Sequence, residues 1–160
     1  MATMNRTPQS TDIVGKTIAR LLQTEWDHSE DYSSCNFYVE FTDGTLIWLL
    51  DDTMELVDTD TRNSLNLRTV DVDTSYPAFF CSSDGETGIG ARVEQVLIAT
   101  YDEVYWVLGG EHYLRSELAE GQTLLGLMDR QEFLYWASIL EFFDYWTKEP
   151  VIFNNMARAN

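Results

Sequence analysis

DRQEFLYWASILEFFDYW, residues 129–146, is the stretch of this sequence that decides the fold. It begins with Asp129, a residue type that caps helix starts, and Glu132 follows three positions later, as in a capping box. Two rows of apolar residues then recur at helical spacing. The first row is Phe133, Trp136, Ala137, Leu140 and Phe143, and the second is Leu134, Tyr135, Ile139, Phe142 and Trp146. We therefore expect one long helix over 129–146, buried on more than one side.

The ends of the chain and its two cysteines indicate a cytoplasmic protein. Residues 129–146 are too short, and too interrupted by charges, to span a bilayer. The N-terminal MATMNRTPQSTD has no apolar core and does not resemble a signal peptide. Cys35 and Cys81 fit neither a zinc pattern nor a disulfide framework, so we expect two reduced thiols. We therefore expect a protein in a reducing compartment, without a membrane segment.

Residues 36–51 give the clearest hairpin. Asp43-Gly44 is a pair that readily forms a two-residue type I′ turn. That loop would place Phe41 opposite Leu46, Val39 opposite Trp48 and Phe37 opposite Leu50, all on one apolar face. The other face of the hairpin would be half polar.

Several further strands surround this hairpin. The segment 13–26 fits either a helix or a strand, and we favour a strand. The acidic run 51–60 fits an edge strand with charged outward side chains, and 65–72 and 123–128 fit two more strands. A run of strands followed by a helix predicts an α+β fold, mostly antiparallel sheet, with the long C-terminal helix packed on it.

The sequence also predicts a domain organisation. We expect a disordered tail over 1–11, a single α+β domain over 12–153, and a second tail over 154–160. Within the domain, VGKTIARLLQT from Val14 resembles IGARVEQVLIAT from Ile89, with Gly15 matching Gly90. The glycine-rich loop 82–90 would divide two related β-meander halves, 12–82 and 89–153. The identities are few, so duplication and coincidence both stay open.

Charge excludes several classes of partner. The 27 Asp and Glu against 10 Lys and Arg give a net charge of −17. Such a charge repels nucleic acids and anionic membranes and attracts basic proteins and cations. It serves either general solubility or the recognition of a positive surface. The sequence leaves open whether the protein forms a homodimer.

No motif indicates catalysis. The chain has no Gly-x-Ser-x-Gly and no phosphate-binding glycine loop. His28 and His112 lack further ligands at metal-site spacing, and 58–63 fails as a calcium loop because Arg62 stands at a ligand position. We therefore predict no enzymatic activity, no metal and no cofactor. Carboxylates are too abundant for their pairing to indicate or exclude carboxylate catalysis.

Aromatic residues among carboxylates remain as the candidate site. An aromatic side chain can anchor a protein interface while carboxylates pair with Lys or Arg around it. The composition resembles that of bacterial immunity proteins and phage-encoded inhibitors, several of which neutralise a basic nuclease or DNA-binding protein, and this resemblance involves no motif. It implies an acidic, DNA-mimic-like inhibitor of a basic protein. The alternatives are a small-molecule binder or carboxylate-dependent enzyme with a pocket under the helix, and a structural subunit. The predicted partner-binding residues are Trp26, Asp27, Glu30, Asp31, Asp51, Asp52, Glu55, Asp58 and Asp60.

Overall fold

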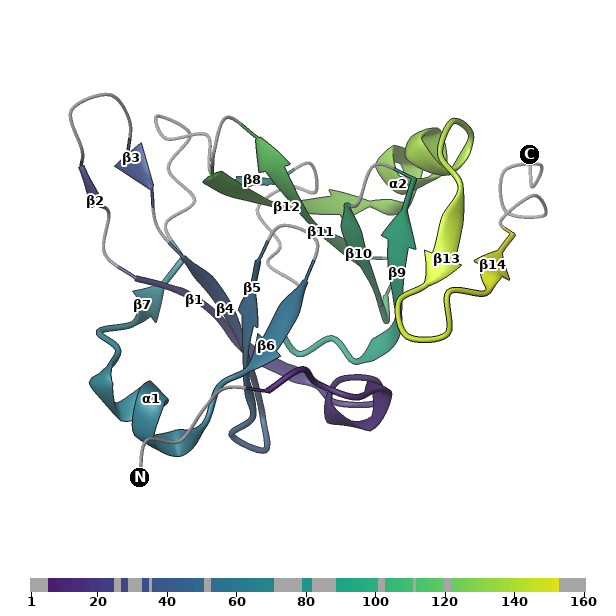
Figure 1. Cartoon of the computed structure of the whole chain (residues 1–160). Coiled ribbons are helices and arrows are strands. Elements are labelled where there is room, and N and C mark those ends of the chain that lie inside the picture. Colours follow the sequence, from purple (N-terminus) through teal and green to yellow (C-terminus); the bar gives the residue numbers. More distant parts are fainter. Residues whose placement is uncertain are drawn as a thin grey trace.

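Two antiparallel sheets dominate the structure, a computed structural model (Figure 1). It describes residues 6–24, 27–28, 33–34, 36–50, 53–70, 79–81, 89–100, 103–110, 112–119 and 122–152. In the described ranges the five-stranded sheet has the order β6 (Met54–Leu56), β5 (Leu46–Leu49), β4 (Phe37–Phe41), β1 (Ile18–Gln23) and β7 (Arg68–Thr69). This arrangement confirms a sheet-dominated α+β fold.

The second sheet is larger and follows the same plan. Its described strands have the order β14 (Pro150–Val151), β13 (Phe142–Asp144), β9 (Val93–Ala99), β10 (Val104–Leu108), β11 (His112–Ala119), β12 (Gln122–Asp129) and β8 (Phe79–Cys81). Strand β8 pairs parallel with β12, whereas the other described pairs are antiparallel. A small hairpin, β2 (Asp27–His28) with β3 (Ser33–Ser34), stands apart from both sheets.

The expected long C-terminal helix is not confirmed, because the segment 129–146 forms a helix and a strand. Helix α2 spans Arg130–Ala137, and β13 begins at Phe142. Asp129 caps α2 as predicted, since its Oδ1 accepts a hydrogen bond from the Glu132 amide at 2.9 Å. Phe142 and Phe143 instead pair with Ala99 and Ile98 at the edge of the second sheet. Pairing with β9 therefore overrides the helical spacing of the later aromatic residues.

The predicted hairpin forms with a different register. The Gly44 amide donates to the Phe41 carbonyl, and the Phe41 amide donates to the Thr45 carbonyl, both at 2.9 Å. The loop therefore has three residues, 42–44, with Gly44 in the left-handed region at φ +90°. This loop moves the pairing by one residue: Val39 lies opposite Ile47, Tyr38 opposite Trp48 and Phe37 opposite Leu49.

Other predicted elements keep their type but are shorter. Within the segment 13–26, Ile18–Gln23 form strand β1 and not a helix. Strand β6 is an edge strand, as expected for 51–60, but that run continues into helix α1 (Thr59–Ser64). Strand β7 covers only two residues of 65–72. The loop 82–88 and the tail 154–160 lie outside the described residues, and Arg6, within the predicted tail 1–11, forms a backbone bridge with Leu56.

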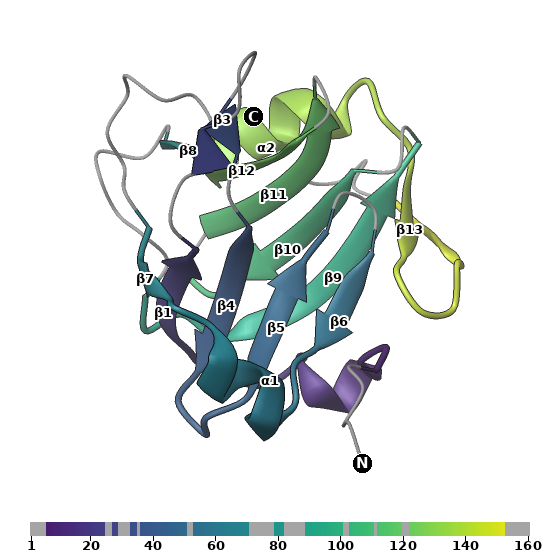
Figure 2. The ribbon, with the colours of Figure 1, turned by 60° about the vertical axis from the view of Figure 1, so that its left-hand side comes forward.

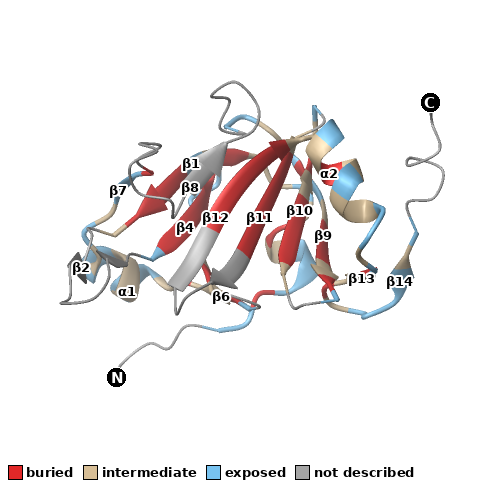
Figure 3. Ribbon diagram, turned by 90° about the horizontal axis from the view of Figure 1, so that it is seen from above, coloured by how far each residue is buried: buried red, intermediate tan, exposed pale blue. Residues whose placement is uncertain are grey.

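The main core lies between the two sheets, which face each other in Figure 2. Strands β4 and β5 of the first sheet and β9 and β10 of the second contribute buried side chains to it, as the burial colours of Figure 3 show. The rings of Phe41 and Trp106 stack across it with centroids 6.0 Å apart. Each sheet also buries its outer face. Tyr38 and Leu46 pack under the segment around α1, and Tyr105 and Tyr113 pack under α2. The half-polar outer face predicted for the first hairpin is therefore largely apolar and covered.

The segments that lead into β1 and β9 are joined by a reciprocal set of backbone hydrogen bonds. The Gly15 amide donates to the Val93 carbonyl, and the Gly90 amide donates to the Ile18 carbonyl, both at 2.8 Å. Thr17 and Arg92 form an antiparallel bridge between these bonds. Both glycines have left-handed φ angles, +93° and +86°, which side chains with a Cβ rarely adopt. The sheets are therefore joined at the beginning of β1 and β9.

Candidate functional site

Of the predicted partner-binding residues, the structure describes Glu55, Asp58 and Asp60 completely. Trp26, Glu30, Asp31, Asp51 and Asp52 lie outside the described residues, and for Asp27 only the backbone is described, in β2. The strands before and after these residues are described. They are β1 and β4 for residues 24–36, and β5 and β6 for residues 50–53.

Four strand connections begin and end on one side of the two-sheet body. They join β1 to β4, β5 to β6, β9 to β10, and β11 to β12. The strand ends that they join lie toward the upper side of Figures 1 and 2, and α1 and the β4–β5 turn lie at the lower side. The sequence of these connections (residues 24–36, 50–53, 100–103 and 120–121) has no lysine or arginine. Their acidic residues are Glu25, Asp27, Glu30, Asp31, Asp51, Asp52, Asp102, Glu103 and Glu120. We call these four segments the acidic connections.

The other three predicted residues lie outside the four connections. Glu55 is in β6, paired with Trp48. Asp58 is the N-cap of α1, and its Oδ1 accepts a hydrogen bond from the Thr61 amide at 2.8 Å. Asp60 is exposed in the first turn of α1. The described part of 51–60 begins at Thr53, runs along β6 and enters α1 at Thr59. A partner-binding role for this run stays a prediction.

Basic residues near α1 and the β4–β5 turn are held in ion pairs. Lys16 Nζ lies 3.0 Å from Asp43 Oδ2, and Arg20 Nε lies 2.6 Å from Glu40 Oε1. Arg62 bonds the other oxygen of Glu40. Hydrogen bonds from the Thr45 backbone and side chain, together with Lys16, hold the pKa of Asp43 at about 2. The basic charge of this side is therefore already neutralised by nearby carboxylates.

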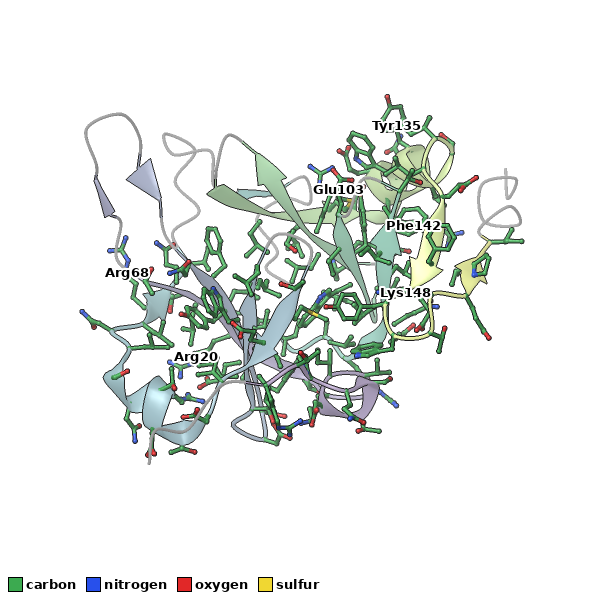
Figure 4. The ribbon with its side chains drawn as sticks, viewed as in Figure 1. Arg20, Arg68, Glu103, Tyr135, Phe142 and Lys148 are labelled. Carbon is green, nitrogen blue, oxygen red and sulfur yellow. The ribbon has the colours of Figure 1, made fainter. Side chains whose placement is uncertain are left out.

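Glu103 is the described carboxylate of the acidic connections, and it precedes β10. It accepts a hydrogen bond from the Tyr105 hydroxyl at 2.9 Å. Figure 4 labels it at the upper side, away from Arg20 on the first sheet. Burial, followed by the charge of Glu103, raises the pKa of Tyr105 well above its usual range. The predicted set omitted Asp102, Glu103 and Glu120. In the sequence, these three residues are recognisable by their position between two consecutive predicted strands.

An apolar groove lies beside α2. It has a volume of about 340 Å³ and lies between the end of α2, β13 and β14, where Leu140, Phe142 and Val151 contribute to its walls and Glu141 is its acidic residue. The space directly beneath α2 is filled, because Phe133 is fully buried and stacks on Tyr113 with centroids 4.0 Å apart. Tyr135 in α2, 59% exposed, points away from the body (Figure 4).

Neither a metal cluster in the described residues nor a similar protein indicates a function. Among the described residues, no three histidine, cysteine, aspartate or glutamate side chains come together as a metal site would need. None of the helices in the described ranges is long and apolar enough to cross a lipid bilayer. No protein-family model matches this sequence, and comparisons with curated proteins and with solved structures find no match.

Proposed function

We propose that this protein is a non-enzymatic acidic binding protein that blocks a basic partner protein through the acidic connections. The observation that carries the proposal is the uneven distribution of charge. Four connections without lysine or arginine join strand ends on one side, while Lys16, Arg20 and Arg62 are held in ion pairs elsewhere. An acidic side attracts a basic protein over several ångströms and speeds its association.

The proposed contact combines carboxylates with aromatic anchors. Trp26 and Tyr32 lie in the longest acidic connection and Tyr101 in another, each within a few residues of aspartate or glutamate. An aromatic ring supplies apolar area that loses water on binding, and the surrounding carboxylates pair with lysine or arginine of the partner. Asp27, Glu30, Asp31, Asp51 and Asp52 belong to the proposed site, and Glu55, Asp58 and Asp60 lie outside the acidic connections.

A charge-matched pair of variants tests this proposal. Capture from a lysate of the source cells at low salt, followed by mass spectrometry, would identify the partner, which is then purified. Association is measured for Asp51→Asn/Asp52→Asn and for the control Asp60→Asn/Glu149→Gln, which removes the same charge at exposed positions elsewhere. We expect the first variant to bind several-fold more slowly, with a smaller salt dependence, and the control to change little.

Two results would contradict the proposal. One is an equal effect of both variants, which would mean that total charge alone attracts the partner. The other is capture of only a mixture of basic proteins, released over a broad range of salt, which would assign the charge to solubility.

One observation favours the structural-subunit alternative. Ile152, which lines the apolar groove, is 74% exposed, and Tyr135 in α2 and Ile139 just after it are 59% and 58% exposed. Exposed apolar surface is typical of a contact with another protein. Light scattering would decide whether the protein self-associates. A Tyr135→Glu variant should then be monomeric if this surface is the contact.

A further inference from the structure

The order of elements along the chain occurs twice. Strands β1, β4, β5 and β6 form a meander that leads into α1, and the chain then returns with β7 to pair beside β1. Strands β9, β10, β11 and β12 lead in the same way into α2, and β13 then pairs beside β9. We call residues 14–70 the first half and residues 89–145 the second half.

The backbone hydrogen bonds of the two halves correspond residue by residue. The Val70 amide donates to Leu21, and the Tyr145 amide donates to Val96, both at 3.0 Å. The Thr42 amide donates to Thr17 at 2.9 Å, and the equivalent Gly109 amide donates to Arg92 at 2.8 Å. An irregularity in pairing also recurs, after Ile18 in β1 and at Val93 in β9. These details are not required by a general meander fold.

Side chains follow the same correspondence. Ile18 and Val93, and likewise Met54 and Leu125, face the shared core. Tyr38 and Tyr105 occupy equivalent positions on the outer faces, in separate clusters. Asp58 and Asp129 are the equivalent N-caps, each accepting a hydrogen bond from the amide three residues later.

We propose that the two halves are copies of one unit and that they dock as the subunits of a two-fold dimer do. The bridge between Thr17 and Arg92 marks the axis, because each bond on one side of it has its counterpart on the other. A two-fold interface pairs the same surface of both partners, so every contact occurs twice. The reciprocal bonds of Gly15 and Gly90 have this property. This inference is independent of the proposed function.

The interaction surface of each half is its inner sheet face, and the partner that it fits is the other half. Both inner faces are apolar and buried, and Phe41 stacks on Trp106 across them. The outer faces have their own apolar clusters under α1 and α2. The two halves should therefore stay together through this surface when the covalent connection between them is cut.

Cutting the folded protein tests the docking. A specific protease site is introduced between Asp73 and Thr74, so that β8 stays with the second half, and the full chain is cleaved after folding. We expect the two pieces to elute as one complex in gel filtration. The midpoint of thermal unfolding should rise with protein concentration in the cut protein, because association then contributes by mass action, and should not do so in the intact protein. Separate elution of the pieces, or a midpoint independent of concentration after cutting, would overturn the proposal.

Matched substitutions in the intact protein test the equivalence. Gly15→Ala and Gly90→Ala place a Cβ at two left-handed positions that we assign the same role. Both should lower the midpoint of unfolding by the same amount. Gly109→Ala is the control, because its backbone is not in the left-handed region, and it should have a smaller effect. A large shift for one of Gly15 and Gly90, with little for the other, would contradict the two-fold relation.

Discussion

The helices α1 and α2 are attached to the outer faces of the two halves by different kinds of contact. In the first half, Arg62 stands four residues after the cap of α1 and bonds Glu40, which Arg20 also contacts. In the second half, Phe133 stands at the same position of α2 and lies among Tyr105, Tyr113 and Phe142. One helix is attached by partly exposed charges and the other by a fully buried aromatic ring.

This difference teaches where the stability of each half comes from. The described residues of α1 bury no side chain completely, and its ion pairs are open to screening by salt. Helix α2 buries Phe133 completely against three aromatic rings, and such pairs stabilise beyond the area that they bury. The shared backbone plan therefore does not depend on one kind of side-chain contact.

The largest expected effect is the removal of the aromatic ring of α2. Phe133→Ala should lower the free energy of unfolding by about 3–5 kcal/mol, because it empties a fully buried site. Arg62→Ala should cost less, about 1–2 kcal/mol, since Arg20 remains to pair with Glu40. Urea unfolding measures both. Equal losses would mean that the two outer faces do not differ as we describe.

Removal of the helix caps should show the similarity of the halves. Asp58→Ala and Asp129→Ala each remove a carboxylate that accepts a hydrogen bond from the first turn. Each should cost about 1 kcal/mol, measured in the same urea assay. The comparison would fail if one of these substitutions were neutral while the other matched Phe133→Ala.

Alkaline unfolding should distinguish the equivalent tyrosines. Burial, and then Glu55, raises the pKa of Tyr38 above 10.0, and burial, and then Glu103, raises that of Tyr105 further. The folded state holds these hydroxyl protons more tightly than the unfolded state does. The resulting contribution to the free energy of unfolding is complete below about pH 10 and is lost as the pH rises. In thermal scans between about pH 9 and 12, Tyr105→Phe should remove more of this loss than Tyr38→Phe. The reverse order would contradict the comparison.

The smallest effect concerns the hairpin turns. The pKa of Asp43 is lowered from 3.8 to about 2, so its contribution is complete above about pH 4 and is lost as the pH falls toward 2. Its side chain is 51% exposed, so the contribution is small. The corresponding Gly109-Gly110 turn has no aspartate. Asp43→Asn should reduce the loss of unfolding free energy between about pH 4 and pH 2. If that loss were unchanged, it would come from other carboxylates.

The sequence predicts which strands and helix caps occur better than it predicts where each element begins and ends. The cap at Asp129 depends on neighbouring residues and was predicted correctly. The helix 129–146 was not, because Phe142 pairs with Ala99, more than forty positions earlier, and no local pattern reports this. The hairpin register failed because Asp43-Gly44 suits both a two-residue and a three-residue loop. The third position of a three-residue loop also favours glycine.

The candidate site shows a similar division. Local composition found the acidic runs 27–31 and 51–52. It could not separate them from Asp58 and Asp60, which follow in the same run, because that separation depends on the direction of β6. It does not show that the strand ends beside these runs share a side with Glu103, since that side is a property of two sheets that meet at Thr17 and Arg92.

Strand β8 has a consequence for the synthesis of the protein. Phe79, Phe80 and Cys81 pair with Leu125, Gly126 and Leu127, which the ribosome adds much later. During this interval the apolar segment FFC has no neighbouring strand from β12 to pair with. Exposed apolar strands in incomplete chains tend to aggregate or to bind chaperones. The growing chain should therefore be most vulnerable between the synthesis of residue 81 and the completion of β12, although in the finished protein this segment pairs with β12 at the edge of the second sheet.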